Sequence, residues 1–147
     1  MKSLVVYDTN YGNTKSIAEA LAKKLGKEVK AVSIQDVKKK ELSGLDLLIV
    51  GSPVIGSNPT EKMSAFLSGL AADQLKGVKA VSFDTRMKLF FFTNAVNKIS
   101  RGLKKAGAQV TTEPQKFWVK GAEGPLLDGE LERAAEWAAA VKAEYLK

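Results

Sequence analysis

Short apolar runs alternate along the chain with longer segments in which apolar residues recur every three or four positions. Residues 4–7 (LVVY) form a continuous apolar run of the length expected for a buried strand. Apolar positions at helical spacing follow at Ile17, Leu21 and Leu25, and Gly26 then ends the pattern as a helix terminator would. This first unit is therefore predicted to be a strand followed by a helix.

The same order of strand and helix is repeated to the end of the chain. Further strands are expected around residues 29–34, 47–50, 78–83 and 110–119. The run 47–50 (LLIV) is apolar throughout and predicts a strand covered on both faces. Pro114 cannot donate to a ladder, so the last strand is expected either to lie at an edge or to be interrupted there. A short helix is expected between residues 37 and 45. Three further helices are indicated by inward-facing stripes: Met63, Phe66, Leu67 and Leu70 after a cap at Asn58 or Thr60; Val96, Ile99, Leu103 and Ala106; and, from near Asp128, Leu131, Ala134, Ala135, Ala138, Val141 and Tyr145.

This alternation predicts an α/β fold, a doubly wound, five-stranded and mainly parallel sheet with helices on both faces. The 147 residues are expected to form one domain, residues 1–147. In such sheets ligands bind beyond the carboxyl ends of the strands. The segments 8–14, 51–59 and 84–93 are therefore the candidate binding loops.

The composition restricts the chemistry that the chain can perform alone. With no Cys and no His, it has no thiol nucleophile, no iron–sulfur ligand and no imidazole for proton transfer or metal binding. We predict neither catalytic side chains nor a metal site. Redox chemistry would have to come from a bound organic cofactor. The N-terminal segment reaches Asp8 too soon for a secretory signal and no apolar run approaches a membrane span, so a cytoplasmic location without membrane insertion is expected.

The net charge of +7 raises the question of an acidic partner or a nucleic acid. Many of the cations alternate with apolar positions and have no aromatic residues among them, which favours a solvated basic face over a nucleic-acid site. They include Lys15, Lys23, Lys24, Lys27, Lys30, Lys38, Lys39 and Lys40. We expect acidic protein partners and no nucleic acid.

The first loop has the residue types of a phosphate site. It reads Thr9, Asn10, Tyr11, Gly12, Asn13 and Thr14 between the first strand and the first helix. A loop entering a helix directs backbone N–H groups and the positive end of the helix dipole at one point, and the hydroxyls and amides add donors. It lacks the Lys-Ser/Thr of a nucleotide-hydrolysing loop and the glycines of a dinucleotide fingerprint, which favours a monophosphate. The alternative is that Asn13 or Thr14 only caps the helix.

This loop resembles the phosphate loop of the flavodoxin family, Ser/Thr-x-Thr-Gly-x-Thr, with Tyr11 in place of the usual Thr. The order of strands and helices, the turn Gly51-Ser52-Pro53 and the short length extend the resemblance over the whole chain. The resemblance implies the strand order 2-1-3-4-5. It also implies FMN as the cofactor, with its phosphate on residues 9–14.

In that family the segment matching the second loop forms a wall on one side of the flavin. Here the resemblance assigns this role to Ser52, Pro53, Val54, Ile55 and Gly56, with aliphatic side chains where many flavodoxins have Tyr or Trp. Gly56 could present a carbonyl to the flavin or only form a turn before the next helix, and these two roles are compatible.

The third loop matches the family's other flavin-flanking segment in position. The candidates there are Phe83, Asp84, Thr85, Arg86 and Phe90. The run from Phe90 to Phe92 could cover the ring, form a docking patch, or be the buried first turn of the following helix. Arg86 or Lys88 near the ring is expected to stabilise a negatively charged reduced flavin.

The leading hypothesis is a carrier that holds FMN and passes single electrons between a reductase and acceptor proteins. Two alternatives remain open from the sequence. One is a small FMN-dependent quinone or nitro-group reductase, although the chain is short for the insertions that wall a substrate pocket. The other is an interaction module of the same fold without a cofactor.

Overall fold

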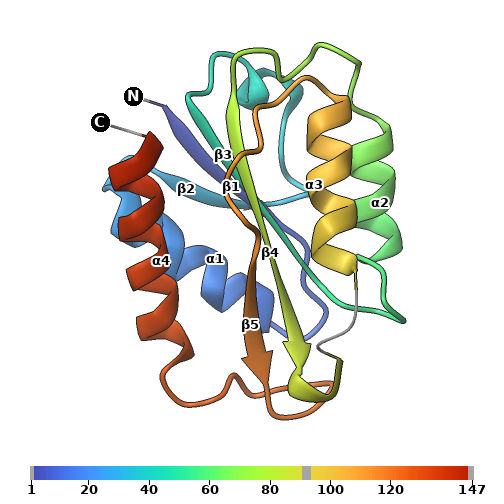
Figure 1. The fold of residues 1–147 in the computed structure, drawn as a ribbon, viewed down its shortest axis with the longest axis vertical. Coiled ribbons are helices and arrows are strands. Elements are labelled where there is room, and N and C mark those ends of the chain that lie inside the picture. Colours follow the sequence, from blue (N-terminus) through green and yellow to red (C-terminus); the bar gives the residue numbers. More distant parts are fainter. Residues whose placement is uncertain (1, 91–93, 146–147) are drawn as a thin grey trace.

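A five-stranded parallel sheet in the order β2-β1-β3-β4-β5 forms the centre of the computed structural model, which describes residues 2–90 and 94–145 (Figure 1). The strands are β1 (Ser3–Tyr7), β2 (Lys30–Ser33), β3 (Leu47–Pro53), β4 (Lys79–Met87) and β5 (Gln115–Val119). The helices are α1 (Asn13–Leu25), α2 (Glu61–Ser68), α3 (Ala95–Lys105) and α4 (Glu130–Tyr145), with short 3-10 turns η1 (Lys39–Leu42) and η2 (Lys88–Phe90). The predicted fold class and strand order are confirmed.

The helices cover the sheet in two pairs, and the alternation of side chains along each strand explains why (Figure 1). Val5 and Ile49 pack in the core beneath α1 and α4, whereas Val6 and Val50 pack in the core beneath α2 and α3. Since both faces of β1 and β3 are buried, apolar residues are favoured on either face. This is why β1 and β3 are continuous apolar runs.

Two expectations for the C-terminal part of the chain are wrong in detail. Residues 110–112 form no strand, and β5 begins only after Pro114, as an edge strand. In α4, Leu131 is 46% exposed, and Trp137 takes a place in the core instead. Trp137 packs against Phe117, and the predicted positions Ala134, Ala138, Val141 and Tyr145 are buried as expected.

The predicted start of the third loop, at residue 84, is also wrong, because residues 84–87 belong to β4. They pair with β3 on one side, up to Pro53 opposite Thr85, and with β5 on the other side. The connection to α3 therefore begins only at Lys88. None of the helices in the described residues has the length and apolarity needed to cross a membrane.

Candidate cofactor-binding site

A cavity of about 190 Å³ opens at the carboxyl edge of the sheet. It is formed by the segment after β1, the end of β3 with its following loop, the end of β4, and the end of β5 with its following loop. The lining residues are Thr9, Asn10, Tyr11, Asn13, Thr14, Pro53, Val54, Ile55, Thr85, Arg86, Met87, Val119 and Ala122. The structure therefore brings residues of all three predicted binding segments to one place.

The N-terminus of α1 presents backbone donors at this cavity. Gly12 precedes the helix in the left-handed conformation (φ 93°), and its own N–H donates to Thr9 Oγ1 at 2.9 Å. Neither Asn13 nor Thr14 caps the helix by its side chain. Within the described part of the chain, no acceptor meets the backbone N–H groups of residues 13–15. Unpaired N–H groups at the positive end of a helix dipole form a favourable site for an anion.

Thr14 is buried, and its hydroxyl lies 2.8 Å from the hydroxyl of Thr85. This contact ties the first turn of α1 to β4 and fixes the helix end relative to the sheet. Asn13 Nδ2 donates to the carbonyl of Glu123 at 3.2 Å. The loop after β5 therefore packs against the predicted phosphate loop.

The loop after β3 is a tight hairpin. Ile55 N–H donates to Asn58 O at 2.7 Å and Asn58 N–H donates to Ile55 O at 3.0 Å. Gly56 and Ser57 between them both have positive φ, 55° and 68°, as a two-residue hairpin turn requires. Gly56 therefore forms the turn and does not line the cavity.

Ser52 holds the start of α2 in place and does not line the cavity. Its hydroxyl accepts the N–H of Thr60 at 3.0 Å. Thr60, the cap of α2, accepts the N–H of Met63 at 3.1 Å and donates to the buried carboxylate of Asp8 at 2.5 Å. This network joins the loops after β1 and β3. Asp8 and Ser52 therefore fix the positions of these loops without lining the cavity themselves.

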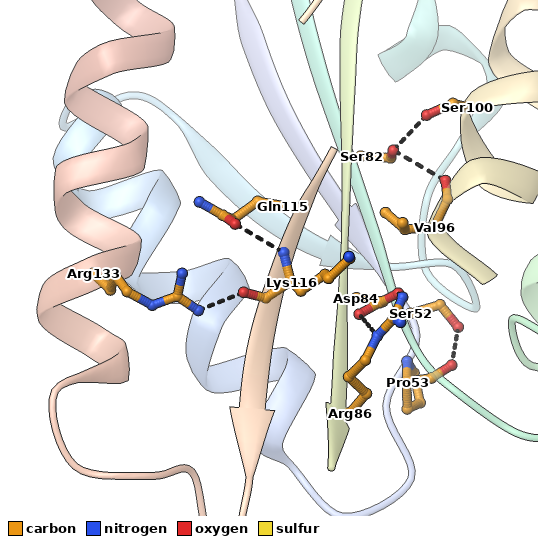
Figure 2. A network of polar contacts seen from close by, with 10 residues as sticks. All are labelled: Ser52, Pro53, Ser82, Asp84, Arg86, Val96, Ser100, Gln115, Lys116 and Arg133. Carbon is orange, nitrogen blue, oxygen red and sulfur yellow. Dashed lines mark hydrogen bonds and ion pairs between the residues drawn. The ribbon is translucent and has the colours of Figure 1, made fainter. Parts of the chain in front are cut away.

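Asp84 and Arg86 form an ion pair in which both side chains are fully buried. Arg86 Nε donates to Asp84 Oδ1 at 2.9 Å, and its terminal nitrogen contacts Oδ2. Figure 2 shows the pair on β4 close to Ser52 of β3. Burial raises the pKa of Asp84, while Arg86, Lys116 and the backbone N–H of Val96 oppose that rise. Because Asp84 neutralises it, Arg86 does not act at the cavity as an isolated positive charge.

Phe83 lies in the hydrophobic core and not at the cavity, which corrects its expected place beside the ring. Its side chain is fully buried and meets Phe117 and Trp137 edge to face, with ring centroids 5.8 and 6.3 Å away. Odd-numbered residues of this part of β4 face α1 and α4. Of the predicted aromatic run, Phe91, Phe92 and the side chain of Phe90 lie outside the described residues.

The sequence as a whole matches the family model described as Flavodoxin over residues 5–137. The chain belongs to the flavodoxin family. It is 30% identical to a flavodoxin of Maridesulfovibrio salexigens over 124 residues, which cover 79% of this chain and 85% of that protein. It is 33% identical to a flavodoxin of Aquifex aeolicus over 91 residues, covering 57% of this chain but only 49% of the relative.

The solved structures agree in fold. Oxidised Flavodoxin 2 from Bacillus cereus superposes with a TM-score of 0.83 at 25% identity, covering 99% of this chain and 100% of that one. A flavodoxin from the domain Archaea gives a TM-score of 0.82 at 22% identity, covering 100% of both chains.

Flavodoxins bind FMN and transfer electrons to redox partner proteins, so this chain is an FMN-binding electron-transfer protein. The comparisons favour neither the reductase nor the module without a cofactor. The unpaired N–H groups at the start of α1 suit the phosphate of FMN, and the flavin supplies the capacity to accept and release electrons. The described residues contain no group of three or more acidic, His or Cys side chains placed to hold a metal ion.

Sequence reasoning missed three residues that line the cavity, Met87, Val119 and Ala122. They lie at the end of β4, at the end of β5 and in the loop after it. Apolar side chains have no distinctive chemistry, so no motif identified them. Met87 and Val119 lie opposite each other at the ends of β4 and β5. A prediction with the correct end of β4 would have placed both residues at the carboxyl edge of the sheet, beside the cavity.

Proposed function

We propose that the flavodoxin site of this chain holds the FMN phosphate on residues 9–14, with the backbone N–H groups of residues 13–15 as its main ligands. The flavin would occupy the adjoining cavity, bordered by Val54 and Ile55 on one side and by Met87 on another. The observation that supports this proposal is that those N–H groups have no acceptor in the described part of the protein. No cation is needed in the loop if the helix end supplies the positive field.

An added negative charge at this helix end tests the proposal. Asn13→Asp places a carboxylate among the same N–H groups, where it would compete with and repel a phosphate. We expect the affinity for FMN to fall about tenfold or more, by the size of a close charge interaction, and the affinity for riboflavin to change little. Fluorescence titration of the FMN-free protein with each ligand measures both.

Gln109→Glu is the matched control. It adds the same charge beside Lys79, at the opposite edge of the sheet, where Gln109 forms a bridge. It should leave both affinities within about twofold, because screening at 0.1 M salt extends over only about 10 Å. Equal losses for FMN and riboflavin in Asn13→Asp would show that the phosphate does not bind at this helix end.

A second expectation follows from the role of an electron carrier. The purified FMN-loaded protein should not oxidise a nicotinamide cofactor at an appreciable steady-state rate without a reductase. Rapid oxidation by the protein alone, followed by absorbance at the nicotinamide band, would support the reductase alternative.

We further propose that the redox partners present acidic docking surfaces and that the protein acts in the cytoplasm as one domain. The net charge of +7 supports the first point, because opposite charge accelerates encounter and selects the partner. Cell fractionation followed by immunodetection of the chain tests the location.

A further inference from the structure

An open groove of about 860 Å³ runs between α2 and α3, on the face of the sheet opposite α1 and α4. Four cations from α3 line it: Lys98, Arg101, Lys104 and Lys105. Pro59, Leu67 and Leu70 contribute apolar surface, and no carboxylate is among the lining residues. The groove therefore combines an apolar lining with concentrated positive charge.

The four cations are exposed. Lys98, Arg101 and Lys104 follow at intervals of three residues and Lys105 lies four residues after Arg101, which places them along one side of α3. The helix contains no acidic residue. Lys104 and Lys105 lie in the last turn of α3, where the helix dipole favours cations, whereas Lys98 and Arg101 gain no such stabilisation and repel each other at this spacing. Among the described residues, none of the four forms an ion pair with a carboxylate. Their charge is available to an external anionic group.

The groove reaches the flavin site through the hairpin after β3. Lys98 Nζ hydrogen-bonds Asn58 Oδ1, and Asn58 is joined to Ile55 by the two backbone hydrogen bonds of the hairpin. Ile55 lines the cofactor cavity and is 50% exposed. Figure 1 shows α2 and α3 side by side, with the β3–α2 connection passing at one end of the pair. A protein seated in the groove would therefore lie next to the edge of the flavin cavity.

We infer that the α2–α3 groove is the docking surface for an acidic face of a redox partner protein. The inference rests on the proposed function, since it supplies the surface for the acidic partners proposed above. A protein is favoured over a single-stranded nucleic acid because the groove has no aromatic lining residue on which bases could stack, and the titration below includes a DNA duplex.

Two triple variants test the location. Arg101→Gln/Lys104→Gln/Lys105→Gln removes three charges from the groove, whereas Lys23→Gln/Lys24→Gln/Lys27→Gln removes three exposed charges at the far end of α1. Each is labelled with nitrogen-15, loaded with FMN and titrated with a deca-glutamate peptide at low salt. In the parent protein we expect the amide shifts to concentrate in α3 and residues 54–60. The dissociation constant should rise about fivefold or more in the groove variant and less than twofold in the remote variant.

Equal weakening by the two triple variants would overturn the inference, because net charge and not the groove would then control binding. A twelve-base-pair DNA duplex that bound the groove more than tenfold more tightly than the peptide would also overturn it and identify a nucleic acid as the occupant. If the groove variant loses its native NMR spectrum, the single variants Arg101→Gln and Lys105→Gln replace it in the test. Each should raise the dissociation constant of the peptide about twofold.

The flavin absorbance of the same samples separates the two proposals. If the parent protein binds no FMN, the proposed function fails, whatever the peptide does with the FMN-free protein. If all variants retain FMN but the peptide does not distinguish them, only the groove inference fails.

Discussion

The phenyl ring of Phe83 packs against the backbone of Gly51 so closely that position 51 has no room for a side chain. A Cβ placed there would lie 2.1 Å from Phe83 Cζ. The two residues are partners in the β3–β4 register. The ring cannot withdraw easily, because Phe117 and Trp137 hold it edge to face. Gly51 is therefore required by the core beneath the flavin site.

Gly51→Ala should lower the free energy of unfolding by about 1–3 kcal/mol, the usual cost of overpacking a closely packed core. Urea denaturation of the FMN-free protein measures it. The double variant Gly51→Ala/Phe83→Leu should lose less than the sum of the two single variants, because the smaller side chain gives the new methyl group space. Simple additivity would show that the contact with Phe83 is not the cause.

The buried ion pair on β4 predicts a larger effect. Asp84→Asn leaves the guanidinium of Arg86 buried without its carboxylate, which should cost about 3–5 kcal/mol of unfolding free energy. The double variant Asp84→Leu/Arg86→Met, in which neither charge remains, should be more stable than Asp84→Asn. Thermal and urea unfolding of these proteins give the comparison, and a double variant less stable than Asp84→Asn would contradict this account.

The same pair shows why part of the fold was not predictable from the sequence. The alternation of apolar runs with helical stripes was sufficient to predict the parallel sheet, because a strand that is buried on both faces is normally a continuous apolar run. Asp84 and Arg86 instead suggested a loop, since charged residues normally end a strand. They lie inside β4 as a buried ion pair, and the pairing of this segment with β3 and β5 is a long-range feature that no local pattern reports.

For the site, the residues with distinctive chemistry were predictable and the apolar ones were not. Gly12 with its neighbouring Thr and Asn residues identified the helix end that the cavity adjoins. Phe83 is a cofactor candidate in the sequence because the third loop matches the family's flavin-flanking segment in position. The alternation of side chains would have assigned it to the face of Val81, in the core beneath α1 and α4.

Glu130 predicts a pH-dependent contribution to stability. Its carboxylate accepts the Trp118 N–H at 2.8 Å and bonds from Arg133 at 2.8 and 3.0 Å, joining α4 to β5. Although burial acts to raise it, these hydrogen bonds lower the pKa of Glu130 below its ordinary value. A carboxyl with a lowered pKa in the folded state stabilises the protein above its unfolded pKa of about 4.3, and this contribution is lost as the pH falls through the folded value.

Glu130→Gln should therefore cost about 1.5–3 kcal/mol of unfolding free energy at pH 7, the range for hydrogen bonds to a charged group. The difference from the parent protein should begin to shrink as the pH falls below the unfolded pKa of about 4.3. It should vanish below the lowered folded pKa of Glu130, where neither chain carries the charge. Glu132→Gln, an exposed neighbour in α4, is the control and should stay within about 0.5 kcal/mol at every pH. A constant deficit for Glu130→Gln down to pH 3 would show that the ionised form contributes nothing.

The basic surface makes a final prediction for electron transfer. The chain carries +7 overall, and the cations of the α2–α3 groove adjoin the hairpin beside the flavin cavity. An anionic oxidant should therefore be attracted towards the site at low salt. The range of this attraction falls from about 30 Å at 0.01 M to about 10 Å at 0.1 M ionic strength. The oxidation of the reduced, FMN-loaded protein by ferricyanide should slow about tenfold over this range.

Stopped-flow absorbance of the flavin measures this rate, and an uncharged quinone serves as the matched oxidant. Its rate should change less than about twofold, because no net charge is attracted. The sign of the salt effect reports the local potential at the flavin edge and not the net charge alone. A ferricyanide rate that rises with salt would mean that carboxylates dominate this edge, and basic rather than acidic partners would then be expected there.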